Sequence, residues 1–176
     1  MTRLLILAEG QTEETFVKLT IAPHLENFGV FVKPTGLWTK RLAHGGGHRG
    51  GASHWNQILR NVRLLTHDTD AWVTTLLDFY GLPADFPGYS EARSAGHPRD
   101  QVACLQTRFA TEVAHSRFIP FFSLHEFEAW VFCAPAVVAE HFGEPDLANA
   151  LARVVDQATE PELINHGPQT HPKARL

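Results

Sequence analysis

Four apolar runs of strand length recur along the chain and predict the strands of a buried sheet. The first, Arg3 to Ala8, is continuous, which is typical of a parallel strand buried on both faces. The others are Val30 to Trp38, Ala71 to Leu77 and Phe118 to Leu124. Pro34 lies inside the second run, and because proline has no backbone N–H it predicts a break or a sheet edge there.

Amphipathic helices are predicted between and after these runs. The segment from Trp55 to Leu65, preceded by Ser53 as a cap, carries the clearest helical spacing of apolar residues. A helix from Thr12 to Gly29, with Thr12 as its cap, follows the first strand, and Pro23 is expected to shorten or kink it. The remaining helical segments are Val102 to Val113, Glu126 to Phe132 and Pro135 to Val155.

The order of these segments predicts an α/β fold with a central, mostly parallel four-stranded sheet flanked by helices, and with extra helices toward the C-terminus. Two stretches rich in glycine or proline, residues 40–52 and 81–98, are expected to be irregular connections. We predict a single domain over residues 1–176, with a core of about 1–133 and a helical extension and irregular tail from 134 to 176.

Composition indicates an ordinary soluble protein, because 44% of the 176 residues are hydrophobic and 19% are charged. No apolar run approaches the roughly 20 residues of a membrane-spanning helix, and MTRLLILAEG does not resemble a signal peptide. The cytoplasm is therefore the expected location, without a membrane partner. Cys104 and Cys133 lie in apolar segments without a CxxC pattern, so we expect reduced core residues.

A net charge of -4 argues against a protein that coats nucleic acid through bulk electrostatics. It does not exclude a nuclease, because metal-binding carboxylates lower the net charge while contacts with phosphates can be local. Basic residues cluster at Lys40, Arg41, Arg49, Arg60 and Arg63. The alternative is that these side chains are simply solvated surface, as most charged residues are.

Three carboxylates stand where predicted strands end, at Glu9, Asp78 and Glu126. Because the C-terminal ends of parallel strands lie side by side at one sheet edge, these acids can share a pocket. Clustered carboxylates repel one another unless a divalent cation lies between them. The spacing therefore favours a Mg²⁺ or Mn²⁺ site for phosphoester chemistry, and the alternative is three ordinary acids in strand-to-loop turns.

Four segments carry a family resemblance: EGQTEETF at 9–16, LLDFYGLPADFPG at 76–88, LHEFEAWVF at 124–132 and ELINHGPQTHPKARL at 162–176. The sequence resembles TOPRIM-type domains of the sort found in OLD-family nucleases. It is more closely similar to a bacterial family of TOPRIM-like proteins, a domain of unknown function often encoded beside ATPases. The resemblance implies a compact α/β domain with a central parallel sheet and acids that bind Mg²⁺.

Residue by residue, the resemblance makes Glu9 the TOPRIM glutamate, a metal ligand or general acid/base in phosphoryl transfer. Asp78 matches the first acid of the TOPRIM DxD pair, and the second acid is replaced by Tyr80. This departure puts two-metal catalysis in doubt unless Glu13, Glu126 or Glu128 supplies the missing ligand.

The spacing of Glu126 and Glu128 predicts different roles for the two side chains, because residues two apart point in different directions on a helix. Phe127 and Trp130 fit the buried side of a short helix, which makes Glu126, nearest the strand end, the better ligand. Glu128 is expected to ligate the metal, to orient a neighbour or to pair with a basic residue. His125 is a candidate proton shuttle, or a histidine satisfied by local hydrogen bonds.

Other motifs are less specific. His44, His48 and His54 lack HExxH or Cys/His spacing, so zinc is disfavoured. The glycines at 45–47 lack the GKS or GKT ending of a P-loop. Asp85 could reach the metal, although an acid in this context is more typical of turn chemistry. The four tryptophans, Trp38, Trp55, Trp72 and Trp130, are expected in the core.

The segment after Glu160 is predicted to be an irregular polar tail. If Asn165, Lys173 and Arg175 fold back to the carboxylate edge, they could bind a scissile phosphate; the alternative is a frayed terminus. By resemblance, relatives continue with a further helical segment, so we expect a shorter or truncated form here.

Together these features predict a Mg²⁺-dependent phosphoester hydrolase, a nuclease for DNA or RNA that works with a partner ATPase in bacterial anti-phage defence. The alternative from another class is a non-catalytic TOPRIM-like adaptor for the ATPase, which the missing acid at Tyr80 favours. A third possibility is a small-molecule phosphatase.

Overall fold

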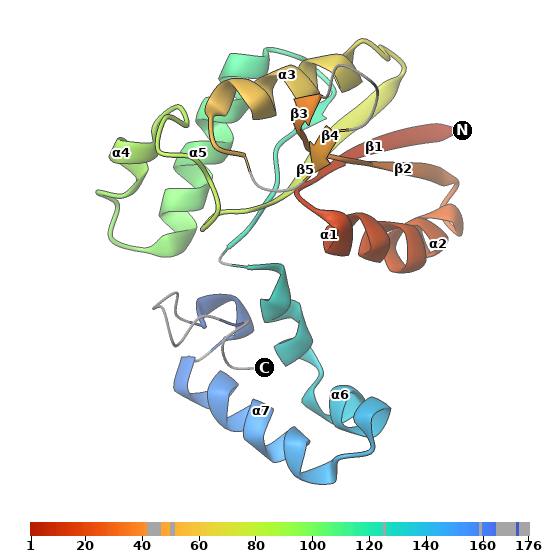
Figure 1. The fold of residues 1–176 in the computed structure, drawn as a ribbon, viewed down its shortest axis with the longest axis vertical. Helices are drawn as coiled ribbons and strands as arrows, with labels where there is room; N and C mark the ends of the chain where they lie inside the picture. The colour runs from red at the N-terminus through yellow and green to blue at the C-terminus, as the bar shows by residue number, and fades with distance from the viewer. Residues whose placement is uncertain (42–46, 50–51, 125, 159, 165–171, 173–176) are drawn as a thin grey trace. The chain divides into compact units, whose positions relative to one another are not determined.

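The computed structural model describes residues 1–41, 47–49, 52–124, 126–158, 160–164 and 172 (Figure 1). Its central element is a five-stranded sheet in the order β2-β1-β5-β6, with β7 also paired to β5. The pairs β1–β2, β1–β5 and β5–β6 are all parallel. These strands are β1 (Thr2–Ala8), β2 (Val30–Gly36), β5 (Ala71–Asp78), β6 (Phe118–Ile119) and β7 (Phe122–Ser123). The predicted α/β fold with a mostly parallel sheet flanked by helices is confirmed.

The predicted fourth strand is in fact two short strands, which corrects the expected count. Pro120 and Phe121 interrupt it between β6 and β7, and proline cannot donate a ladder hydrogen bond. The buried Thr75 hydroxyl bridges the gap, because its Oγ1 donates to Phe121 O at 2.7 Å and accepts from Phe121 N at 2.9 Å. A side chain of β5 thus supplies the bonds that the regular ladder lacks.

Strand β1 lies between two parallel neighbours, and its residues Leu5 to Ala8 are buried. This explains the continuous apolar run, since both faces of the strand are covered. Pro34 lies opposite Ile6 on β2, which is an outer strand of the sheet. The predicted sheet edge at Pro34 is confirmed.

A single helical segment follows β1, but its hydrogen bonding changes along its length. It consists of α1 (Gln11–Phe16), a π-helical turn (Val17–Ile21) and α2 (Ala22–Glu26). Ala22 N–H donates to Val17 O, the wider spacing of a π-helix, just before Pro23. The disturbance expected from Pro23 is therefore a π turn. The helix begins at Gln11 with Gly10 as its N-cap, so the prediction of Thr12 as the cap was wrong.

Part of the stretch predicted as an irregular loop forms a hairpin. Strands β3 (Trp38–Arg41) and β4 (Gly47–Arg49) pair antiparallel, with Lys40 opposite His48 and Arg41 opposite Gly47. Cross-strand hydrogen bonding orders this glycine-containing segment where composition alone suggested a loop. Residues 42–46, 50 and 51, with His44 and four of the glycines, lie outside the described residues.

Helices α3 (Trp55–Thr66), α4 (Tyr89–Ala92) and α5 (Pro98–Val113) belong to the same part of the chain (Figure 1). Rings from α3, α5, β6, β7 and the loop before α4 form one aromatic cluster: Trp55, Phe86, Phe109, Phe118 and Phe122. Phe109 is fully buried and contacts the other four rings at centroid distances of 4.8–5.9 Å. Trp55 is buried as predicted, whereas Trp72 is 38% exposed.

The chain divides into two compact units, one with residues 1–77 and 81–122 and one with residues 78–80 and 123–176. The second unit contains a 3₁₀-helix (Phe127–Cys133), α6 (Pro135–Phe142), α7 (Pro145–Ala158) and a 3₁₀ turn (Pro161–Leu163). Phe132, Leu151 and Ile164 form its core. The single helix predicted from Pro135 is divided at Gly143, whose φ of 68° ends α6.

Both cysteines are free thiols, and Cys133 is exposed, so its predicted core position was wrong. Local burial of the thiol and, second, the nearby Glu162 carboxylate raise the pKa of Cys133. Cys104 is half-buried. None of the helices in the described ranges is long and apolar enough to cross a membrane.

Replacing Phe109 by alanine should destabilise the protein by about 3–5 kcal/mol, because it removes the central ring of the aromatic cluster and leaves a cavity. Urea unfolding followed by circular dichroism measures the change. Phe142→Ala, at a side chain that is 66% exposed, is the matched control and should change stability by less than about 0.5 kcal/mol. Equal losses for the two variants would contradict the central role of Phe109.

Candidate functional site

Glu9 is positioned by backbone hydrogen bonds at the C-terminal end of β1. Its N–H donates to Leu76 O of β5 at 3.0 Å, and Leu37 N donates to Ala8 O at 2.9 Å. The sheet register agrees, since Ala8 lies opposite both Gly36 and Leu76. The turn that carries Glu9 is therefore tied to the ends of β5 and β2, and the Glu9 side chain is half-buried.

The Glu13 side chain stabilises the start of α1, the helix to which it belongs. Its Oε2 accepts a hydrogen bond from Gly10 N at 2.8 Å, so the carboxylate satisfies a backbone donor at the start of α1. A Cβ atom at position 10 would lie 3.0 Å from the same oxygen, so a larger residue there would require a small shift of the Glu13 side chain. Glu13 thus has a capping role that the sequence pattern did not reveal, because the N-cap is a glycine and not serine or threonine.

Asp78 ends β5 and is grouped with the second unit, together with Ser123, Glu126 and Glu128. Asp78 is half-buried and its Oδ1 atom is shielded from solvent. Phe79 N donates to Ser123 O at 2.9 Å, which holds the strand end beside β7. Ser123 is 2% exposed, and within the described residues its Oγ has no hydrogen-bond partner. A buried hydroxyl of this kind calls for a bound water or ion.

Glu126 and Glu128 lie at the start of the 3₁₀-helix and are both half-buried. Glu126 is the N-cap residue in extended conformation, and its carbonyl oxygen accepts from Ala129 N at 3.1 Å. Phe127, Ala129 and Phe132 are the buried residues of this helix. Phe127 is buried as predicted, but Trp130 is half-buried, so its predicted place on the buried side was wrong, because the helix is 3₁₀ in type and buries every third residue from 129 to 132.

The Asp85 carboxylate stabilises the start of α3. Its Oδ1 accepts from Trp55 N at 2.8 Å, and its Oδ2 lies 3.5 Å from His54 Nδ1. The side chain therefore caps α3 from a loop 30 residues away in sequence, in place of the predicted cap Ser53. The next residue, Phe86, is buried in the aromatic cluster and fixes this loop.

Some predicted site residues are not placed. His125, Asn165, Lys173 and Arg175 lie outside the described residues, as does the side chain of His48. Tyr80 is 49% exposed. Within the ranges that the structure describes, no three His, Cys, Asp or Glu side chains are grouped so as to hold a metal ion.

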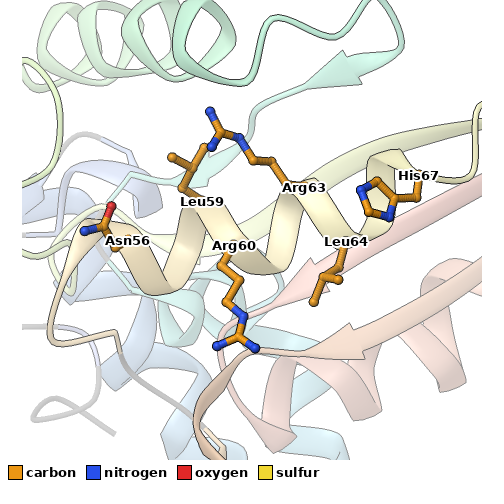
Figure 2. A pocket seen from close by; sticks show the side chains of 6 residues that line it. All are labelled: Asn56, Leu59, Arg60, Arg63, Leu64 and His67. Atoms are coloured by element: carbon orange, nitrogen blue, oxygen red, sulfur yellow. The ribbon is translucent and has the colours of Figure 1, made fainter.

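A second feature is a shallow pocket of about 340 Å³ along the outer face of α3 (Figure 2). Its lining residues are Asn56, Leu59, Arg60, Arg63, Leu64 and His67. Only Arg60 and Arg63 belong to the basic cluster recognised in the sequence. The sequence signal that indicates this region is its lack of acids, because no Asp or Glu occurs between Asn27 and His67.

The fold defines an α/β protein with a mostly parallel central sheet flanked by helices and with acids at the ends of β1 and β5. A family model described as a domain of unknown function (DUF4276) matches residues 8–176. The chain therefore belongs to the DUF4276 family. No curated protein and no solved structure matches it.

Asp85→Ala should lower stability by about 1 kcal/mol, because the first turn of α3 loses its hydrogen-bond acceptor. Thermal and urea unfolding measure the loss. Asp85→Asn keeps an acceptor oxygen and is the matched control, with most of the stability expected to remain. A loss of Mn²⁺ binding in Asp85→Ala, with stability unchanged, would instead make Asp85 a metal ligand.

Proposed function

We propose that this chain is a TOPRIM-like, Mg²⁺-dependent phosphoester hydrolase that acts as a nuclease. The observation that carries the proposal is the position of two acids at the ends of neighbouring parallel strands. Glu9 directly follows β1, with its N–H bonded to Leu76 O at 3.0 Å, and Asp78 ends β5 shortly after Leu76. Ligands of α/β proteins bind outside this edge of the sheet.

The oxygen donors near the strand ends have the chemistry that Mg²⁺ prefers. They include the Asp78 carboxylate, with its shielded Oδ1, and the buried Ser123 hydroxyl. Mg²⁺ is usually held by one or two carboxylates and keeps several water molecules. Glu9 and Asp78 would therefore suffice as protein ligands without a group of three acids.

In the proposed site Glu9 and Asp78 hold the ion, and Glu126, the third ligand that the sequence predicts, is not grouped with them among the described residues. Glu128 is an alternative to Glu126, and Glu13 ranks behind both because its carboxylate already accepts the Gly10 N–H. Mg²⁺ held by these residues would supply Lewis acidity and a water molecule of lowered pKa as the nucleophile. The carboxylates would position the ion, and basic side chains near the site would offset the negative charge that develops on the phosphate.

The nucleic-acid substrate, the partner ATPase, the cytoplasmic location and the role in anti-phage defence rest on the resemblance to TOPRIM-like proteins encoded beside ATPases. A second candidate is a non-catalytic adaptor for the ATPase. It is favoured by Tyr80, which is 49% exposed at the position of the second TOPRIM acid, and by the capping role of Glu13.

Calorimetric titration of the intact chain with Mn²⁺ tests the site. Wild type should bind Mn²⁺, and Glu9→Gln and Asp78→Asn should each weaken binding by about tenfold or more, because each removes a charged oxygen ligand. Glu26→Gln, an exposed acid on α2, is the matched control and should bind as wild type does. Absence of binding at millimolar Mn²⁺ would refute the catalytic proposal.

Cleavage of labelled DNA and tRNA, measured beside the titration, separates the two candidate functions. The nuclease requires Mg²⁺-dependent cleavage that EDTA and Glu9→Gln both abolish. An adaptor would leave the nucleic acid intact, with and without a partner ATPase, even when Mn²⁺ binds.

Ser123→Ala should raise the free energy of unfolding by about 1 kcal/mol in EDTA, because the variant no longer buries a hydroxyl without a partner. Urea unfolding measures the gain, which should disappear at saturating Mn²⁺ if the hydroxyl serves the metal site. Thr75→Val is the control at a buried hydroxyl that is bonded to Phe121, and it should be destabilising in both conditions. A loss of stability for Ser123→Ala in EDTA would contradict the assignment.

A further inference from the structure

One stretch of the chain is free of acids. Between Asn27 and His67 there is no Asp or Glu, although the whole protein has a net charge of -4. The cations in this stretch are Lys33, Lys40, Arg41, Arg49, Arg60 and Arg63. Positive charge is thus concentrated in one continuous segment of an otherwise acidic protein, and local charge of one sign attracts oppositely charged ligands.

This segment folds into neighbouring elements of the first unit. It comprises β2, the β3–β4 hairpin and α3, and α3 contacts β1, β3 and α5 (Figure 1). Lys40 and Arg41 belong to β3, and the backbone of β3 contacts that of α3. Two elements of the acid-free stretch, β3 and α3, are therefore neighbours in space.

One face of helix α3 is buried, and the opposite face is exposed to solvent. Trp55, Ile58 and Val62 are buried, whereas Arg60 and Arg63 are exposed. Figure 2 shows both arginines projecting from the helix beside Leu59, Leu64 and His67, which line the same pocket of about 340 Å³.

Arg60 and Arg63 have no carboxylate partner among the described residues, unlike Arg3 and Arg108. Arg3 pairs with Asp68 at 2.6 Å, and Arg108 pairs with Glu91 at 2.7 Å. Arg63 Nη2 approaches only the backbone oxygen of Glu112, at 3.5 Å. Their charges are thus not neutralised by an ion pair within the described chain, which leaves them for an anionic ligand.

We propose that the outer face of α3, with Arg60 and Arg63, binds the sugar-phosphate backbone of a nucleic-acid strand. Two exposed arginines three residues apart on the helix suit a linear polyanion, and the pocket adds an amide and aliphatic side chains that suit sugars and bases. A membrane surface is disfavoured, because an interfacial helix presents large apolar and aromatic side chains and this face of α3 has only Leu59 and Leu64.

This surface deepens the proposed nuclease function by giving its substrate a binding face, but binding itself needs no metal. The test is therefore made in EDTA with a 5′-labelled 20-nucleotide single-stranded DNA and the RNA of the same sequence. Fluorescence anisotropy is recorded between 50 and 200 mM salt. The anisotropy in EDTA reports on this surface without a metal ion, whereas the Mn²⁺ titration reports on the metal site, so failure of the metal site and failure of this surface are distinguishable.

The variant Arg60→Gln/Arg63→Gln should raise the Kd about tenfold at 50 mM salt. It should also reduce the slope of log Kd against log salt by about 1.4, since each lost phosphate contact on a single strand accounts for about 0.7. Arg60→Lys/Arg63→Lys retains the charge and should keep most of the affinity. Unchanged thermal unfolding of the variants shows that the fold is intact.

Arg99→Gln/Arg153→Gln is the matched control, because it removes the same charge from two exposed arginines on α5 and α7. It should change the Kd by less than about twofold, since contacts that stay in place keep their contribution to the affinity. Equal weakening by the two double variants would attribute binding to overall charge and overturn the proposal. Absence of binding by wild type at 50 mM salt, or binding to phosphatidylserine vesicles but not to the oligonucleotides, would also overturn it.

Discussion

The parallel pairing of β1 with β5 is the constraint on which the candidate site depends. It places Ala8 opposite Leu76 and lets the Glu9 N–H bond to Leu76 O, so that the turn after β1 is tied to the end of β5. Because both strands run in the same direction, their C-terminal residues come to one edge. Glu9 and Asp78, far apart in the sequence, reach that edge through the sheet register and not through local geometry.

The same unit uses the loop after β5 to support α3. Phe86 enters the aromatic cluster around Phe109, and Asp85 caps the first turn of the helix. These contacts bury one face of α3 and leave Arg60 and Arg63 on the other. A segment that composition predicts to be an irregular connection therefore holds α3 in place, and the exposure of Arg60 and Arg63 depends on it.

Much of the fold is predictable from the sequence because its causes are local. Continuous apolar runs identified β1 and β5 within a residue, and Pro34 indicated the outer position of β2. Helices α3 and α5 followed from apolar spacing. Of the site, the positions of Glu9 and Asp78 at strand ends were predicted, and the shared metal site stays a prediction.

The sequence alone determined which segments form strands and which form helices, which acids follow the ends of strands, and which stretch contains no acids. The tertiary structure decided how these residues are used. Glu13 binds the Gly10 N–H, Asp85 caps a distant helix, and Thr75 replaces the hydrogen bonds missing around Pro120. Periodicity depends on residues within a few positions of each other, whereas the partner of a carboxylate or hydroxyl depends on which distant segments the fold brings within hydrogen-bond distance.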